Sequence, residues 1–120
     1  MQPRASEAAL STPPVFRDIF RRGSATRSGP VTLWSLRTRA GVRRAGVIAR
    51  ASHGRLKSHD RQRARRLLRE VIRRAQHQLP PSVDLILMLT CPGHGVPTFH
   101  EVRTAVLTAC ATQHLLVASR

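Results

Sequence analysis

The sequence predicts an α+β fold in which helices cover a single β-sheet. Short apolar segments at residues 31–36, 43–50 and 83–90 are bounded by turn residues, which is typical of strands. Amphipathic segments with a period near 3.6 residues lie between and around them, the longest at about 59–78. The order is therefore helix, strand, strand, helix, strand, helix. At 120 residues this order fits one antiparallel or mixed sheet with helices on one side, a two-layer α/β sandwich.

The first helix is expected to follow a short leader. Residues 1–12 are rich in small residues and predict a flexible N-terminal leader, so that one domain spans residues 13–116 and a C-terminal tail spans 117–120. The prolines at 13–14 can open a helix, because an N–H in the first turn would have no partner there. Gly23 is suited to end it. The apolar residues of this helix fall on one face: Val15, Phe16, Ile19 and Phe20.

Two strands are expected between this helix and the next one. Residues 24–30 contain serine, glycine and proline, and they predict a turn-rich connector. The strands at 31–36 and 43–50 are then joined by a turn at 37–41. Residues 51–57 leave two alternatives, a basic loop or a short third strand followed by a loop.

The long helix at about 59–78 is the most regular element. Ser58 or Asp60 can cap its start, and Pro80 ends it. Its apolar residues follow one stripe that is expected to face the core: Ala64, Leu67, Leu68, Val71, Ile72 and Ala75.

A strand and a helix complete the domain. Residues 83–90 are mostly apolar and predict a central buried strand, followed by a Pro/Gly loop at 91–97. Thr98 and Glu101 have the spacing of a capping box, which predicts that a helix begins there. Its inner face is expected to contain Phe99, Val102, Val106, Ala109 and Cys110.

The charge balance indicates an anionic partner. The chain has 21 Lys+Arg against 6 Asp+Glu, a formal net charge of +15. A surface this basic repels itself unless RNA, DNA or an anionic membrane shares it. Lys57 is the only lysine, and the planar guanidinium of arginine suits phosphate because it can donate two parallel hydrogen bonds.

The long helix concentrates this charge on the side opposite its apolar stripe. That side carries Arg65, Arg66, Arg69 and Arg73, flanked by Arg61, Arg63 and Arg74. Like charges three or four residues apart repel on a helix, and Glu70 alone offers local relief. Solvated helix faces usually mix signs, so this face predicts polyanion binding. A membrane is disfavoured because the basic face carries no Trp or Phe.

The cysteines and histidines leave two alternatives. Cys91, His94, Cys110 and His114 have spacings that could form a Cys2His2 zinc site, whereas Cys110 also fits the apolar face of the last helix. Two cysteines are too few for a disulfide framework, and no apolar run has membrane-spanning length, so we expect a cytoplasmic protein. The sequence contains no paired acid–base residues, no P-loop and no dinucleotide-binding motif, and it therefore predicts no catalytic residue.

Three segments carry a family resemblance. Residues 61–70, Arg-Gln-Arg-Ala-Arg-Arg-Leu-Leu-Arg-Glu, resemble the Arg-Asn-Arg-x-Lys-Arg-x-x-Arg-Glu signature of the bacterial ribonuclease P protein component. Residues 15–23, with paired phenylalanines and a closing glycine, are similar to the first helix of that family. Residues 79–80 followed by Asp84 and an apolar strand are also similar, so the resemblance covers about residues 13–115.

The chain departs from the family pattern at three places. Gln62 stands where the family usually has Asn, and Arg65 replaces Lys with the charge kept. The Lys-Lys pair that precedes the long helix in the family falls near Ser52 and His53 here, with other basic residues close by. The last of these departures bears on the contacts of the loop before the helix.

The resemblance implies both a fold and an activity. The family fold is an α-β-β-β-α-β-α sandwich, like the second domain of ribosomal protein S5, with a left-handed βαβ crossover. The implied function is to assist the catalytic ribonuclease P RNA, which uses bound magnesium to remove the 5′ leader of precursor tRNA. The partners would be these two RNAs, with no membrane and no obligate protein partner.

The resemblance also implies two sets of site residues. The signature helix and the segment before it would contact the catalytic RNA through Arg61, Gln62, Arg63, Arg65, Arg66, Arg69, Arg73, Arg50, Arg55 and Lys57. A cleft between the first helix and the sheet would take the leader, with Phe16 and Phe20 offering surfaces to unpaired bases and Arg17 a phosphate contact. Alternatively, both phenylalanines are core residues. The alternative function is a basic nucleic-acid-binding module of ribosomal or nucleoid-associated type.

Overall fold

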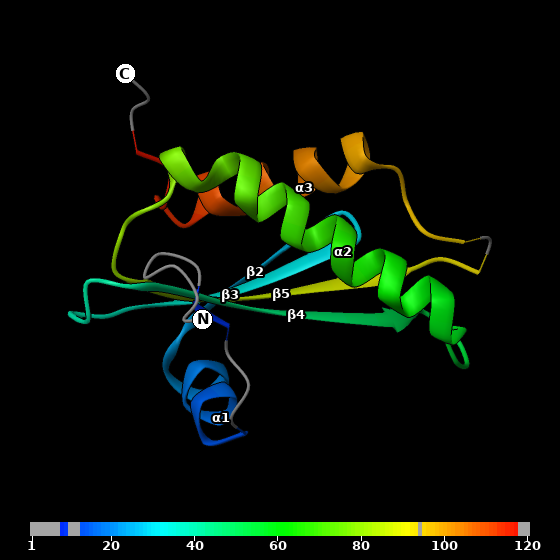
Figure 1. Cartoon of the computed structure of the whole chain (residues 1–120), viewed down its shortest axis with the longest axis horizontal. Helices are drawn as coiled ribbons and strands as arrows, with labels where there is room; N and C mark the ends of the chain where they lie inside the picture. Colours follow the sequence, from blue (N-terminus) through cyan, green and yellow to red (C-terminus); the bar gives the residue numbers. More distant parts are fainter. Residues whose placement is uncertain (1–7, 10–12, 94, 118–120) are drawn as a thin grey trace.

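The computed structural model describes residues 8–9, 13–93 and 95–117 (Figure 1). One helix, three strands, a helix, a strand and a helix follow one another, with a short strand in front of them, so the α+β fold class is confirmed. The elements are β1 (Ala8–Ala9), α1 (Pro13–Arg22), β2 (Ser24–Ser28), β3 (Val31–Arg37), β4 (Arg43–Ala51), α2 (Ser58–Ala75), the 3-10 turn η2 (Gln76–Gln78), β5 (Val83–Cys91) and α3 (Phe99–Thr112).

The sheet is mixed, and its strand order is β1-β4-β5-β3-β2. The central strand β5 runs antiparallel to β3 and parallel to β4, and its buried residues confirm the predicted central strand. In Figure 1 the chain follows β4 at the front, returns through α2 above the sheet and enters β5 behind β4. This path is the left-handed crossover that the resemblance implied.

Helices cover both faces of the sheet, because both faces are apolar. Val31 and Leu33 of β3 face the main core beneath α2 and α3, whereas Trp34 and Leu36 of the same strand face α1. Ile19 of α1 packs there against β5, and Figure 1 shows α1 on the opposite side of the sheet from α2 and α3. The expectation that all helices lie on one side is therefore wrong for α1. Alternation along β3 leaves apolar side chains on each face, and each face needs a cover.

The polar segment after α1 is a strand, where the sequence predicted a connector. Residues 24–28 form the edge strand β2, which pairs antiparallel with β3 and is mostly exposed. Its serines and alanine give no apolar alternation, so pairing with β3 decides its conformation against local preference. The strand that completes the three-strand run of the family order is thus β2. Of the two alternatives for the segment before the long helix, residues 52–57 form a loop.

The ends of the chain lie mostly outside the described residues. Within the expected leader at 1–12, the described residues 8–9 form β1, which pairs parallel with β4. The other residues of that leader, and residues 118–120 of the expected tail, are outside the described ranges. Val117 donates its backbone N–H to the carbonyl of Gln78 at 2.7 Å.

The two long helices begin differently. Lys57 occupies the N-cap position of α2 and makes no side-chain capping hydrogen bond, so capping by Ser58 or Asp60 is wrong. Both residues instead lie inside the first turn. There the negative charge of Asp60 interacts favourably with the positive end of the helix dipole. At α3, Thr98 and Glu101 form the predicted capping box. The inner face of α3 is confirmed, and it also contains Ala105.

Gly23 allows the end of α1 to pack closely against the sheet, because it has no side chain. Its N–H donates to the carbonyl of Ile19 at 2.8 Å, which ends the helix as predicted. A Cβ at position 23 would lie 2.6 Å from that carbonyl oxygen and 2.7 Å from the carbonyl oxygen of Ser35. Only glycine therefore allows this turn to approach β3 so closely.

Gln113 fastens the end of α3 to the two strands at the β2 edge. Its side-chain carbonyl accepts a hydrogen bond from Ser35, and its amide donates to the hydroxyl of Thr26 at 2.9 Å. On the other side of β5, Arg43 of β4 donates to the carbonyls of Leu79 and Pro80 after α2. No described helix is both long and apolar enough to cross a membrane.

Candidate nucleic-acid interface

The exposed side of α2 is the basic surface that the sequence predicted. The buried stripe is Ala64, Leu68, Val71, Ile72 and Ala75, and Leu67 packs partly against the same core. The opposite side points away from the sheet and carries Gln62, Arg63, Arg66 and Arg69, all exposed, with Arg65 half-buried beside them. We call Arg63, Arg65, Arg66 and Arg69 the open arginines.

The open arginines have no partner within the part of the chain that the structure describes. No hydrogen bond or ion pair reaches their guanidinium groups from residues 8–9, 13–93 or 95–117. Arg61 differs, because it donates to the carbonyl of Leu56 at 3.0 Å and so ties the first turn of α2 to the preceding loop. The open arginines thus present a dense positive charge directly to solvent. A charge placed in this way can neutralise the phosphates of a nucleic-acid backbone and release their counterions.

The last turns of α2 are arranged differently. Both carboxylate oxygens of Glu70 accept hydrogen bonds from Arg73, at 2.8 and 2.6 Å, and one of them also accepts from Arg74 at 3.0 Å. The hydrogen bond from Arg73 is the main cause that lowers the pKa of Glu70 to about 2, and the bond from Arg74 adds to it. The Arg74 guanidinium also lies 4.7 Å from the centre of the Phe99 ring of α3.

The basic residues before α2 divide between two places. Arg55 and Lys57 are exposed in the loop that leads into the helix. Arg50 instead belongs to β4, where alternation puts it on the face of α1, and its Nε lies 3.4 Å from the hydroxyl of Thr90. The structure therefore groups Arg55 and Lys57 with the start of α2 and separates Arg50 from them.

The face of α1 is aromatic. Phe20 is one of two large apolar side chains exposed among the described residues, with 43% of its surface accessible. Its ring and that of Trp34 form a T-shaped pair with a centroid distance of 4.9 Å, and its centroid lies 6.4 Å from that of the Phe16 ring. Phe16 is half-buried against Ile19, and Arg17 is exposed beside it. The alternative of a core role fits Phe16 better than Phe20.

Trp34 is a residue of this face that the sequence analysis did not assign to a site. Its position was available from the alternation of residues 31–36, which sets it opposite to Val31 and Leu33. The side chain of Val15, predicted on the inner face of α1, is not among those that the structure describes.

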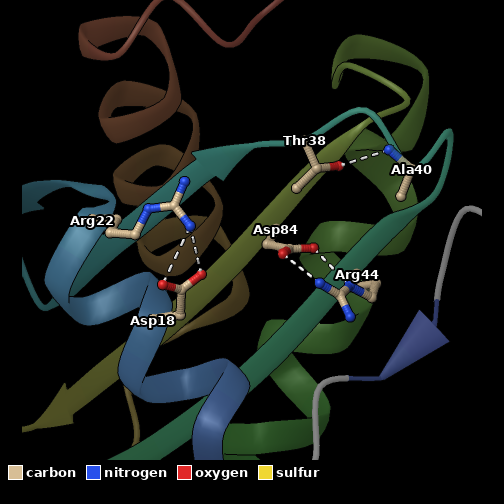
Figure 2. Close-up of polar contacts among 6 residues, drawn as sticks. All are labelled: Asp18, Arg22, Thr38, Ala40, Arg44 and Asp84. Atoms are coloured by element: carbon tan, nitrogen blue, oxygen red, sulfur yellow. Dashed lines mark hydrogen bonds and ion pairs between the residues drawn. The ribbon is translucent and has the colours of Figure 1, made fainter.

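Two ion pairs lie on the same side of the sheet as α1 (Figure 2). Asp18 and Arg22 pair across one turn of α1, with an N–O distance of 3.0 Å, and both are accessible to solvent. Asp84 of β5 is 3% exposed and accepts two hydrogen bonds from Arg44 of β4, at 2.8 and 2.6 Å. The hydrogen bond to Asp84 is the largest cause that raises the pKa of Arg44. Asp84 was predicted only as the start of a strand, since its partner is distant in sequence.

The two cysteines are buried and form no disulfide. Burial raises the pKa of both thiols, that of Cys110 to about 11, so each is a neutral core side chain near neutral pH. No group of three metal-binding side chains occurs among the described residues, and His94 of the zinc alternative lies outside them.

Together these features define an α+β protein with an arginine-rich helix on one face of its sheet and aromatic rings on the other. Residues 5–113 match the family model for ribonuclease P. The chain therefore belongs to the ribonuclease P protein family and is a protein subunit of ribonuclease P, which acts in tRNA processing and has an RNA partner. The alternative of a ribosomal or nucleoid-associated module is not favoured.

Solved structures share the fold. The RNase P protein of Staphylococcus aureus superposes with a TM-score of 0.72 at 11% identity, over 91% of this chain and 97% of that one. The RNase P protein of Thermotoga maritima superposes with a TM-score of 0.69 at 20% identity, over 83% of this chain and 92% of that one. A search of curated protein sequences gave no significant match.

Proposed function

We propose that this subunit assists a catalytic RNA in removing the 5′ leader of precursor tRNA, by binding the RNA subunit with one face and the leader with the other. The observation that carries the proposal is the row of open arginines on α2. Guanidinium groups that have no partner in the described protein are available to neutralise phosphates. We assign α2, with Arg55 and Lys57 before it, to the RNA subunit.

The aromatic face of α1 suits the leader. Unpaired nucleotides are held by stacking of bases on exposed aromatic rings, and Phe20 offers such a ring, supported by the half-buried Trp34. Arg17 and Arg50 lie on the same side of the sheet and would contact leader phosphates. Arg50 is thus moved from the RNA-subunit set to the leader set, because of the side of β4 on which it lies.

The protein would contribute no catalytic residue, and the magnesium ions would be held mainly by RNA. Five acidic side chains within the described residues are each engaged: Asp18, Glu70 and Asp84 by arginines, Asp60 by His59 and Glu101 by the capping box of α3. Bound magnesium would activate the water that attacks the phosphodiester. What the protein adds is affinity for the leader and neutralisation of RNA charge. We place the reaction in the cytoplasm.

Reconstitution tests this proposal. The purified protein is mixed with a bacterial ribonuclease P RNA and a precursor tRNA, at a magnesium concentration too low for efficient cleavage by the RNA alone. We expect cleavage at the mature 5′ end to be restored. Salt-sensitive binding to every RNA and DNA offered, without restored cleavage, would instead indicate a general nucleic-acid binder.

A further inference from the structure

The arginines that follow Arg61 on α2 are of two kinds, although the sequence presents them as one series. The open arginines occupy the helix from Arg63 to Arg69. The next two, Arg73 and Arg74, both donate to the carboxylate of Glu70. The change occurs within one helical turn, and Glu70 lies at the point where it happens.

We propose that Glu70 ends the RNA-binding surface of α2, so that the RNA backbone contacts the open arginines and not Arg73 or Arg74. This inference rests on the proposed function, because it assumes that α2 meets the RNA subunit. It assigns Glu70 a positioning role, and it removes Arg73 from the residues expected to touch RNA.

The geometry of the Arg73 pair supports an internal role. Nε and one terminal nitrogen of Arg73 each donate to a different oxygen of Glu70, which is the two-pronged arrangement by which arginine would otherwise hold a phosphate. A phosphate would have to displace a carboxylate that already satisfies this fork. It would also approach a carboxylate whose pKa of about 2 keeps it negative at every physiological pH.

Arg74 is held from a second direction. Its guanidinium lies over the Phe99 ring, with 4.7 Å to the ring centre, while its Nε donates to Glu70. The cation–π contact joins α2 to the first turn of α3 and keeps this side chain near the protein surface. Charge placed so near to α3 serves the packing of the two helices.

A repulsive group at the end of an attractive surface also gives specificity. Arginines at a spacing of three or four residues would let an RNA backbone slide along α2 in several registers. A negative charge after Arg69 penalises the registers that reach the last turns of the helix. Glu70 would therefore set where the RNA backbone leaves α2.

Three variants and one matched control test the inference, with affinity for the ribonuclease P RNA measured over a series of salt concentrations. Glu70→Gln removes the negative charge that Arg73 and Arg74 now neutralise, so we expect roughly fivefold tighter binding and a salt dependence steeper by about one phosphate contact. The double variant E70Q/R73Q keeps the net charge, and we expect its affinity to stay within about twofold of the unmodified protein. Asp18→Asn adds the same charge on α1 and should leave the affinity for the RNA subunit unchanged. Circular dichroism checks that each variant is folded.

Arg66→Gln separates failure of this inference from failure of the proposed function. We expect it to weaken binding about fivefold and to lower the salt dependence by about one contact. If E70Q/R73Q weakens binding as much as Arg66→Gln does, Arg73 touches RNA and the inference is overturned. If Arg66→Gln changes nothing, α2 does not meet the RNA subunit and the proposed function itself is overturned.

Discussion

The two faces of the sheet carry surfaces of opposite character. On the α2 face the arginines from Arg63 to Arg69 are open, and the ring of Phe99 lies under the paired Arg74. On the α1 face the exposed ring of Phe20 packs against the half-buried ring of Trp34, and two ion pairs lie on the same side of the sheet (Figure 2). The comparison teaches that one small domain can separate attraction of phosphates from contact with bases, because the sheet lies between the two surfaces. Changes on one face should then leave the other nearly unaffected.

The largest effect should come from the partly buried ion pair of Arg44 and Asp84. Asp84→Asn removes a carboxylate that is almost closed to water from an arginine side chain that is 35% exposed, and we expect the free energy of unfolding to fall by roughly 2.5 kcal/mol. Urea unfolding followed by circular dichroism measures this loss. The single tryptophan, Trp34, lies on the same face, so its fluorescence reports whether the disturbance is local to α1.

The exposed pair on α1 is the control for this experiment. Asp18→Asn breaks an ion pair that is open to solvent, and it should cost less than about 0.5 kcal/mol. Equal losses for the two variants would mean that burial does not distinguish the two pairs.

The next effect concerns the α2 face alone. Arg63→Ala combined with Arg66→Ala removes two phosphate contacts, and we expect affinity for the RNA subunit to fall about 30-fold at ~0.15 M salt, with a salt dependence lower by nearly two contacts. Discrimination between precursor and mature tRNA by the assembled enzyme should persist. An affinity that does not change would remove these two residues from the interface.

The smallest effect concerns the α1 face. Phe20→Ala removes a ring that is only partly accessible, and we expect about fivefold weaker binding of precursor tRNA by the assembled enzyme, near the lower end for a stacked base. Binding of mature tRNA, which has no leader, should not change. Phe99→Leu is the matched control, because it removes a ring from the other face. An equal loss with both tRNAs would contradict a leader contact.

The elements with strong periodicity could be predicted from the sequence. The long helix and the central strand were found because their apolar residues repeat at 3.6 residues or form a continuous run. The edge strand β2 was missed because it is polar and exposed, and only its partner β3 gives it a conformation. The position of α1 was missed because amphipathicity shows that a helix covers a sheet and does not show which face it covers.

The candidate site was predictable to a similar extent. The helical wheel located the open arginines, because their exposure follows from the position of the buried apolar stripe on the opposite side of α2. The separation of Arg50 from the other basic residues follows from the alternation of β4, but only once the face of α1 is known. The pairing of Asp84 with Arg44 joins residues on different strands, so it depends on a register that local sequence does not contain.

The place of β5 in the sheet has a consequence for synthesis of the protein. This strand lies between β3 and β4, yet it follows both of them and α2 along the chain. During translation, the ribosome must therefore release nearly all of the basic segments before the central hydrogen-bond ladders can form. Such long-range pairing slows folding. A nascent chain with this topology spends its unfolded lifetime beside ribosomal RNA, and an RNA partner that binds only the folded form would draw the equilibrium toward it.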